Sequence, residues 1–108
     1  MQLRIRETIL RDAGFMVSIA TSAESALALL RTAGPRFGVI ITDHVLPGAS
    51  GAEFVRDLRQ MNPDVPVIVV SGMPDVADEY EGSNAVFRQK PLPPPELIQL
   101  VRDAMDHR

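Results

Sequence analysis

The chain has 108 residues, a length that suits one domain with one hydrophobic core. Hydrophobic residues make up 45% of it and charged residues 23%, so we expect a folded domain. The net charge of -3 argues against a nucleic-acid surface, and the lack of cysteine excludes disulfides, thiol catalysis and cysteine metal sites. No apolar run approaches the roughly 20 residues of a membrane span, and the N-terminus is unlike a signal peptide, so we expect a cytoplasmic protein.

The first third of the chain predicts a helix, a short strand and a second helix. Residues 3–13 carry apolar side chains at helical spacing, and residues 16–20 are a candidate strand. Thr21 and Glu24 have the spacing of a capping box, which predicts a helix that ends before the Gly-Pro pair at 34–35. The apolar stripe of the first helix consists of Ile5, Ile9 and Leu10.

The rest of the chain alternates strands with helices. Residues 39–41 and 67–70 are continuous β-branched runs, which are typical of strands buried on both faces. Ser50 and Glu53 repeat the capping-box spacing at the start of a helix that ends at Pro63. The remaining predicted elements are a weaker helix over 74–80, a strand over 85–89, and a terminal helix with Leu97, Leu100, Val101 and Ala104.

This alternation predicts an α/β fold, a parallel sheet with helices on both faces. In open sheets of this kind, ligands bind beyond the carboxyl ends of the strands. Asp43 follows the first apolar run, Ser71 follows the second, and Lys90 follows the last strand, so the three should meet at one edge. A carboxylate can carry a phosphoryl group as an acyl phosphate, while a hydroxyl and an ammonium can hold its oxygens.

Each of these residues has an ordinary structural explanation when it is taken alone. Asp43 could cap a turn or a helix, Ser71 begins a common turn dipeptide, and Lys90 could be a solvated surface charge. Their occurrence at three successive strand ends is what favours a shared site. His44 could be a ligand, but a loop side chain beside the pocket is the commoner role at such a position.

Three segments resemble the receiver domain of two-component response regulators, the CheY-like family. Residues 39–51, Val-Ile-Ile-Thr-Asp-His-Val-Leu-Pro-Gly-Ala-Ser-Gly, are similar to the family's phosphoacceptor strand and the turn after it. Residues 66–72, Pro-Val-Ile-Val-Val-Ser-Gly, resemble its switch strand, and residues 87–91, Phe-Arg-Gln-Lys-Pro, resemble its Lys-Pro strand end. The resemblance covers nearly the whole of residues 1–108, and the sequence is especially similar to receivers of hybrid histidine kinases. It implies a flavodoxin-like fold.

The resemblance implies a role for each residue of the candidate site. Asp43 would be the phosphoacceptor, and Ser71 and Lys90 would contact the phosphoryl group. Phe87 would be the aromatic switch residue that follows Ser71 inward, although core packing explains a phenylalanine there equally well. The bond before Pro91 would be a cis peptide, which is affordable only before proline.

A receiver also opens with a strand that ends in two or three acidic residues, and that segment is missing from this sequence. In the family those acids help to hold Mg²⁺, so only Asp43 and the main-chain carbonyl of Val45 would remain, and the ion should bind weakly or not at all. The missing strand is central in the family's order 2-1-3-4-5. We therefore expect an N-terminally truncated receiver with four strands, in which 16–20 pairs with 39–41 or exchanges within a homodimer.

These features predict a signalling module rather than an enzyme. A histidine kinase or phosphotransfer protein would donate phosphate to Asp43, and phosphorylation would switch a protein-interaction surface without direct contact to nucleic acid or membrane. A degenerate, phosphorylation-independent interaction module is the alternative, because the acids are missing. A small phosphatase with Asp43 as nucleophile is a third hypothesis, but the sequence offers no obvious general acid for it.

Overall fold

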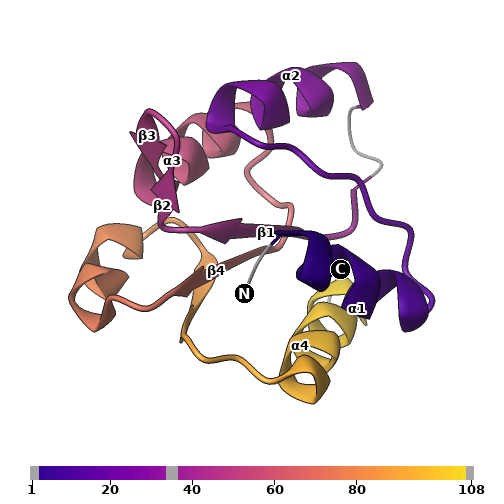
Figure 1. Cartoon of the computed structure of the whole chain (residues 1–108). Coiled ribbons are helices and arrows are strands. Elements are labelled where there is room, and N and C mark those ends of the chain that lie inside the picture. The colour runs from indigo at the N-terminus through magenta and orange to yellow at the C-terminus, as the bar shows by residue number, and fades with distance from the viewer. Residues whose placement is uncertain (1–2, 34–36, 107–108) are drawn as a thin grey trace.

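The computed structural model describes residues 3–33 and 37–106, and a parallel sheet of three strands lies at its centre (Figure 1). The order in this sheet is β1-β4-β5, and the register places Ile41 opposite Ile68 and Val69 opposite Phe87. A separate antiparallel hairpin is formed by two short strands. The strands are β1 (Ile40–Asp43), β2 (Val45–Leu46), β3 (Ala49–Ser50), β4 (Val67–Ser71) and β5 (Ala85–Gln89).

Helices cover both faces of the sheet, as the alternating sequence predicts. The helices are α1 (Leu3–Asp12), α2 (Ala23–Ala33), α3 (Gly51–Met61), the 3-10 helix η2 (Pro74–Tyr80) and α4 (Pro94–Asp106). Every residue of β4 is buried. Val67 and Val69 pack in the core beneath α2 and α3, whereas Ile68 and Val70 pack in the core beneath α1 and α4 (Figure 1). The apolar run in β4 therefore reflects a strand with two buried faces.

The helix starts show how local sequence sets the element boundaries. Ser50 caps α3, since its hydroxyl accepts a hydrogen bond from the Glu53 N–H at 3.1 Å. The predicted cap of α2 at Thr21 is wrong by one residue. Instead, Ser22 and Ser25 cap each other, because each backbone N–H donates to the other's hydroxyl oxygen at 3.1 Å. Both serines are short enough to reach the amides of the first turn.

The predicted strand over 16–20 does not form, so the sheet has three strands rather than four. Within the described chain, residues 16–20 make no backbone–backbone hydrogen bond and do not pair with β1. Phe15 and Val17 pack against the core under α1 and α4, and a cavity separates this segment from β1. Without a hydrogen-bonded neighbour, an extended segment is not part of a sheet.

Three smaller differences concern boundaries and faces. The weak helix over 74–80 is a 3-10 helix, and the strand predicted over 39–41 spans 40–43. The predicted end of the second helix at 34–35 lies outside the described residues. In α1, Ile5 is 52% exposed whereas Arg6 is only 5% exposed, so the buried stripe includes a charged residue instead of this isoleucine.

Candidate functional site

The carboxyl ends of the three parallel strands bring the predicted site residues to one edge. Asp43 ends β1, Ser71 ends β4, and Lys90 directly follows β5. Asp43 is in register with Val70, one residue before Ser71. The backbone N–H of Lys90 donates to the Ser71 carbonyl at 2.7 Å, so these two strand ends are tied together.

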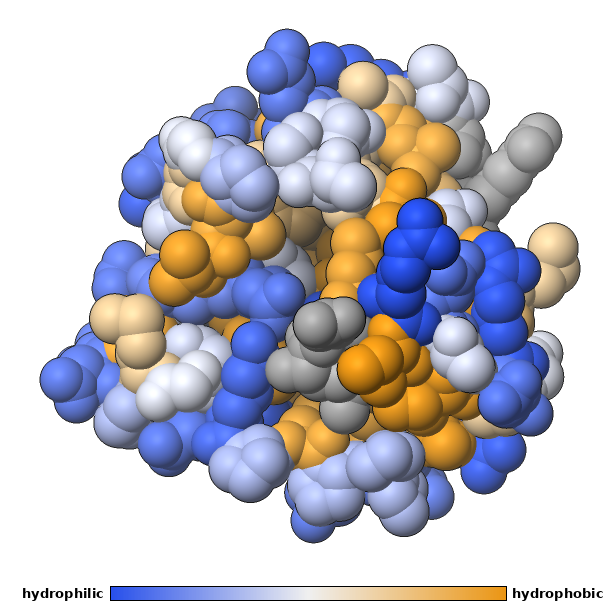
Figure 2. Space-filling view, in the orientation of Figure 1, coloured by the Kyte–Doolittle hydropathy of each residue, from blue (hydrophilic) through white to orange (hydrophobic). Residues whose placement is uncertain are grey.

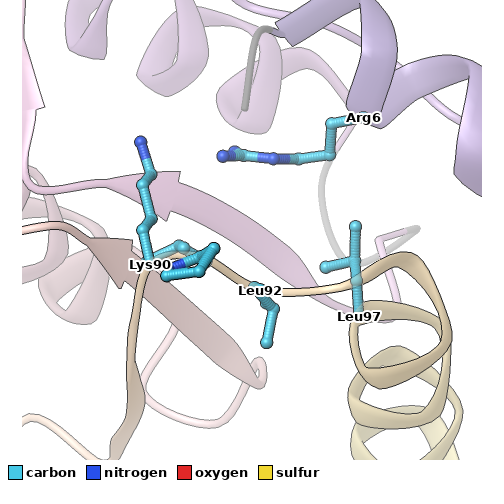
Figure 3. Close-up of a pocket in the computed structure, with 6 residues that line it drawn as sticks. Arg6, Lys90, Leu92 and Leu97 are labelled. Carbon is cyan, nitrogen blue, oxygen red and sulfur yellow. The ribbon is translucent and has the colours of Figure 1, made fainter.

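Two cations contact the same oxygen of Asp43. The Lys90 ammonium lies 3.1 Å from Oδ1, and an Arg6 Nη2 lies 2.9 Å from it. The Arg6 side chain is 6% exposed, while those of Lys90 and Asp43 are 32% and 31% exposed. Figure 3 shows Arg6 reaching from α1 across the strand ends toward Lys90. Arg6 was not predicted from the sequence as part of the site.

The two cations decide the ionisation of Asp43. Partial burial raises the pKa of its carboxyl, but the hydrogen bond and charge of Arg6, followed by those of Lys90, outweigh this effect. The net result is a pKa below the ordinary value. Asp43 is therefore a carboxylate at neutral pH, which is the state a nucleophilic or metal-binding aspartate requires.

The other predicted residues surround this ion pair at different depths. Ser71 is 4% exposed, and its hydroxyl oxygen accepts a hydrogen bond from the Met73 N–H at 3.0 Å. Phe87 is half-buried in β5, and its ring centroid lies 5.9 Å from that of Tyr80. Val45 lies in the short hairpin with an exposed side chain. The peptide bond between Lys90 and Pro91 is cis.

His44 lies in the bend between β1 and β2, directly after Asp43, but its side chain is buried. Its Nδ1 lies 2.7 Å from the Tyr80 hydroxyl, and the two rings meet edge to face. Its Nε2 lies 3.8 Å from a carboxylate oxygen of Glu79. His44 thus connects the end of β1 to η2, a contact for which the sequence carries no recognisable signal because the partners lie 36 residues apart.

A cavity of about 520 Å³ opens beside the ion pair. Arg6 and Lys90 lie on one side of it, while its remaining lining is apolar (Figure 3). The apolar lining residues are Val70, Pro91, Leu92 and Leu97.

The family model described as the response regulator receiver domain matches residues 1–102. This chain belongs to the response regulator receiver family. The resemblance stated from the strand-end motifs is thus confirmed.

Curated relatives of this receiver are longer proteins. It is 35% identical over 106 residues to the hydrogenase transcriptional regulatory protein HoxA of Cupriavidus necator, covering 94% of this chain and 21% of that protein. It is 38% identical over 98 residues to the response regulator receiver protein Anae109_2439 of Anaeromyxobacter sp., covering 85% and 39%. It is 34% identical over 97 residues to the transcriptional regulatory protein FixJ of Rhizobium meliloti, covering 87% and 47%. The chain therefore spans less than half the length of each.

Solved structures confirm the flavodoxin-like fold. The CheY-like receiver domain protein of Methanospirillum hungatei superposes with a TM-score of 0.88 at 24% identity, covering 97% of this chain and 85% of that one. The chemotaxis protein CheY4 of Vibrio cholerae gives a TM-score of 0.80 at 28% identity, covering 95% and 91%. The receiver arrangement thus persists although the sheet described for this chain has three strands.

Receiver domains are regulatory rather than catalytic domains, and phosphorylation-based switching is their general role. They interact with histidine kinases or phosphotransfer proteins, and they generally bind Mg²⁺ at the phosphorylation site. Across the ranges 3–33 and 37–106, no helix has the length and apolar character needed to cross a bilayer.

The donor set at Asp43 does not fit Mg²⁺ in this arrangement. Within the described part of the chain, no three His, Cys, Asp or Glu side chains gather into a cluster that could hold a metal ion. Among the residues that the structure describes, Asp43 is the only carboxylate at the strand ends, and Arg6 and Lys90 already contact its Oδ1. A divalent cation there would face two positive charges and a single carboxylate, whereas Mg²⁺ favours a full set of oxygen ligands.

Proposed function

We propose that this chain is a phosphorylation-controlled receiver in which Asp43 accepts a phosphoryl group from the phosphohistidine of a histidine kinase or phosphotransfer protein. The position of the Asp43 carboxylate carries this proposal, because it lies at a strand end within 3.1 Å of the Lys90 ammonium. Both cations contact Oδ1, and the described residues offer no hydrogen bond or ion pair to Oδ2. Oδ2 is therefore the oxygen that attacks.

The transfer conserves atoms and charge at named positions. Oδ2 of Asp43 forms a new O–P bond while the N–P bond of the phosphohistidine breaks. The imidazole nitrogen keeps the electron pair of that bond and takes up a proton. Lys90 offsets the negative charge on the transferred group, and Ser71 donates its hydroxyl proton to a phosphoryl oxygen. The Ser71 oxygen at present accepts only from Met73, so this proton is available.

The conformational response follows from the contacts of Ser71 and Phe87. Movement of Ser71 toward the phosphoryl group opens space at the end of β4, and Phe87 turns inward from β5. Phe87 contacts Tyr80, and Tyr80 in turn contacts His44, so a change at β5 reaches η2. The surface of η2 and β5 is then the interface that a partner reads.

Intact-mass analysis after treatment with acetyl phosphate tests this function. We expect slow addition of one phosphate group to the native chain and none to Asp43→Asn, because Asp43 lacks a neighbouring carboxylate to share a metal ion. Lys90→Met should slow the addition further. Equal labelling of Asp43→Asn would overturn the assignment of the acceptor, and rapid, near-complete labelling of the native chain would contradict the expected slow rate.

A second candidate function is a phosphorylation-independent interaction module. The ion pair between Arg6 and Asp43 favours it, because a buried guanidinium takes the position beside the carboxylate where a cation would otherwise act. This function predicts no phosphate addition from acetyl phosphate or from a phosphohistidine donor, even after long incubation. The same mass measurement therefore separates the two candidates.

A further inference from the structure

The 3-10 helix η2 has little stability of its own. It has seven residues, whereas 3-10 runs longer than three or four residues are uncommon because their hydrogen bonds have poor geometry. Its N-cap residue, Met73, makes no side-chain capping hydrogen bond. Asp75 and Asp78 are exposed on its outer side, and Figure 2 shows mostly hydrophilic surface at the lower left, where Figure 1 draws η2 in orange. The contacts of its inner side therefore set the position of η2.

Two side chains anchor η2 to the rest of the domain. Val76 and Tyr80 are its buried residues, and both pack in the core beneath α2 and α3. Among the described residues, η2 makes one hydrogen bond to a part of the chain outside residues 71–83, and this bond joins the Tyr80 hydroxyl to Nδ1 of His44. Val76 thus holds η2 against the core, whereas Tyr80 also ties it to the residue directly after Asp43.

The Tyr80 hydroxyl lies where three elements meet. His44 follows β1, Gly51 begins α3, and Tyr80 ends η2. The hydroxyl lies 2.5 Å from the place that a Cβ would take on Gly51, so a glycine at this position leaves room for it. The Gly51 N–H donates to the His44 carbonyl, which fixes the backbone beside the imidazole. Because no side chain lies between the imidazole and the hydroxyl, a shift of the backbone after Asp43 acts on η2 directly.

The groups around the imidazole decide the direction of this hydrogen bond. Nε2 of His44 lies 3.8 Å from a carboxylate oxygen of Glu79, and a carboxylate can only accept, so in the neutral ring the proton lies on Nε2. Nδ1 is then an acceptor. Tyr80 keeps its proton, because burial and then the charge of Glu79 raise the pKa of its hydroxyl to about 12. The hydroxyl therefore donates to Nδ1 at 2.7 Å, and both ring nitrogens face residues of η2.

Core packing alone does not explain a histidine at this position. A buried imidazole costs free energy unless its nitrogens have partners, and an apolar side chain of similar size would fill the same space without that cost. Two successive residues of η2, Glu79 and Tyr80, supply the partners. Such a buried polar contact favours a single arrangement, because it is lost completely when η2 moves away from His44.

We propose that the hydrogen bond between His44 and Tyr80 is a lock that holds η2 in its resting position until phosphorylation of Asp43 releases it. This inference rests on the proposed function, in which the surface of η2 and β5 changes between two states. A phosphoryl group on Asp43 acts on the backbone that carries the imidazole, because His44 is the next residue in the chain. Phe87 approaches Tyr80 from β5, with ring centroids 5.9 Å apart, so its inward movement displaces the same tyrosine. The lock opposes both movements, and its strength therefore sets how readily η2 switches.

Amide hydrogen exchange of the unphosphorylated chain tests the lock independently of phosphate transfer. The reporter is the Ser83 amide, which donates to the Tyr80 carbonyl at 3.1 Å and exchanges when the end of η2 opens. Tyr80→Phe removes the hydroxyl but keeps the ring, and it should speed this exchange about tenfold. The Lys90 amide is the internal reference, because it donates to the Ser71 carbonyl outside η2, and its exchange should change by at most about twofold.

Two variants of His44 separate the hydrogen bond from the shape of the ring. His44→Leu offers no acceptor and should speed Ser83 exchange as much as Tyr80→Phe does. His44→Asn places an amide oxygen near the position of Nδ1, so exchange should stay within about threefold of the native rate. The double variant that combines His44→Leu with Tyr80→Phe should exchange no faster than either single variant, because both remove the same bond. Asp78→Asn, on the exposed side of η2, is the control and should leave exchange unchanged.

Labelling by acetyl phosphate supplies the second readout. Because the lock favours the resting state, Tyr80→Phe should label about fivefold faster than the native chain. Equal acceleration of Ser83 and Lys90 exchange in Tyr80→Phe would mean that the tyrosine supports the whole fold, and it would overturn the lock. Additive effects in the double variant, or unchanged labelling of Tyr80→Phe beside a labelled native chain, would overturn it as well. Fast Ser83 exchange in Tyr80→Phe without labelling of any chain would support the lock and contradict the proposed function.

Discussion

Replacing Arg6 by methionine tests the contact that most distinguishes this site. Methionine keeps most of the side-chain volume but removes the charge and the 2.9 Å hydrogen bond to Asp43. Hydrogen bonds to charged groups contribute about 1.5–3 kcal/mol to the free energy of unfolding. The Asp43 carboxylate is 31% exposed and keeps Lys90 as a second partner, so the lower end of this range applies. We therefore expect Arg6→Met to lower the free energy of unfolding by about 1.5 kcal/mol.

The same variant should change how stability depends on pH. The depressed pKa of Asp43 means that its contribution is fully present above the unfolded-state value of about 3.9, and that it is lost as pH falls through the lower folded-state pKa. The stability difference between native chain and Arg6→Met should therefore be constant from about pH 5 to pH 8 and should shrink below about pH 4.

Urea unfolding of a double-mutant cycle measures the interaction directly. The cycle combines Arg6→Met with Asp43→Asn, and Arg4→Met serves as the control because Arg4 is exposed on the same helix. The losses in the free energy of unfolding of the two single variants should add up to about 1–2 kcal/mol more than the loss in the double variant. Coupling below about 0.3 kcal/mol, or a difference that stays the same at acid pH, would refute the assignment of the Arg6 guanidinium as the main partner of Asp43.

Three further predictions concern the core around the site. Gly51→Ala should lower the free energy of unfolding by about 1–3 kcal/mol in urea melts, because the added Cβ would lie 2.5 Å from the Asp43 backbone carbonyl oxygen. Gly72→Ala is the control: its Cβ would have nothing within 4 Å, so the free energy of unfolding should change by at most about 0.5 kcal/mol. Burial, and then the charge of a neighbouring glutamate, raise the pKa of Tyr80 to about 12, and it is the only tyrosine. Alkaline titration of tyrosinate absorbance should therefore show a midpoint near pH 12 in the folded chain and about pH 10 in denaturant. The folded chain should lose stability as the pH rises between these two values. A midpoint near pH 10 in the folded chain would contradict the burial of Tyr80. Arg59→Met should lower thermal stability by about 2 kcal/mol, because its guanidinium donates to four backbone carbonyls, and the exposed Arg56→Met should not; equal effects would contradict this role.

The parts of the fold that repeat a simple rule could be predicted from the sequence. Continuous apolar runs identify β4 because both of its faces are buried, and Ser50 marks the start of α3 because its hydroxyl caps the first turn. The meeting of Asp43 and Lys90 was predictable for a similar reason. Parallel strands end at the same edge, so residues that follow separate strands converge without any local sequence signal.

The contacts that the sequence did not reveal join residues far apart in the chain. Arg6 lies on the buried face of α1, where charged residues are rare, and Asp43, 37 residues later, supplies its counter-charge. The segment 16–20 has the composition of a strand, but its pairing depends on a neighbour at the right distance. Local pattern can indicate extended backbone, but only tertiary structure decides whether a strand lies beside it.

The arrangement around Asp43 places two requirements of a phosphoacceptor in opposition. Arg6 and Lys90 keep the carboxylate ionised at neutral pH despite its partial burial, which favours its readiness to attack phosphorus. The same two positive charges repel a divalent cation and reduce the electron density that the carboxylate can offer to it. Because Arg6 is nearly buried and Lys90 is one-third exposed, Lys90 can turn toward a phosphoryl group far more easily than Arg6 can leave. Arg6 therefore limits the metal affinity of the site, and Lys90 remains the cation that can follow the transferred phosphoryl group.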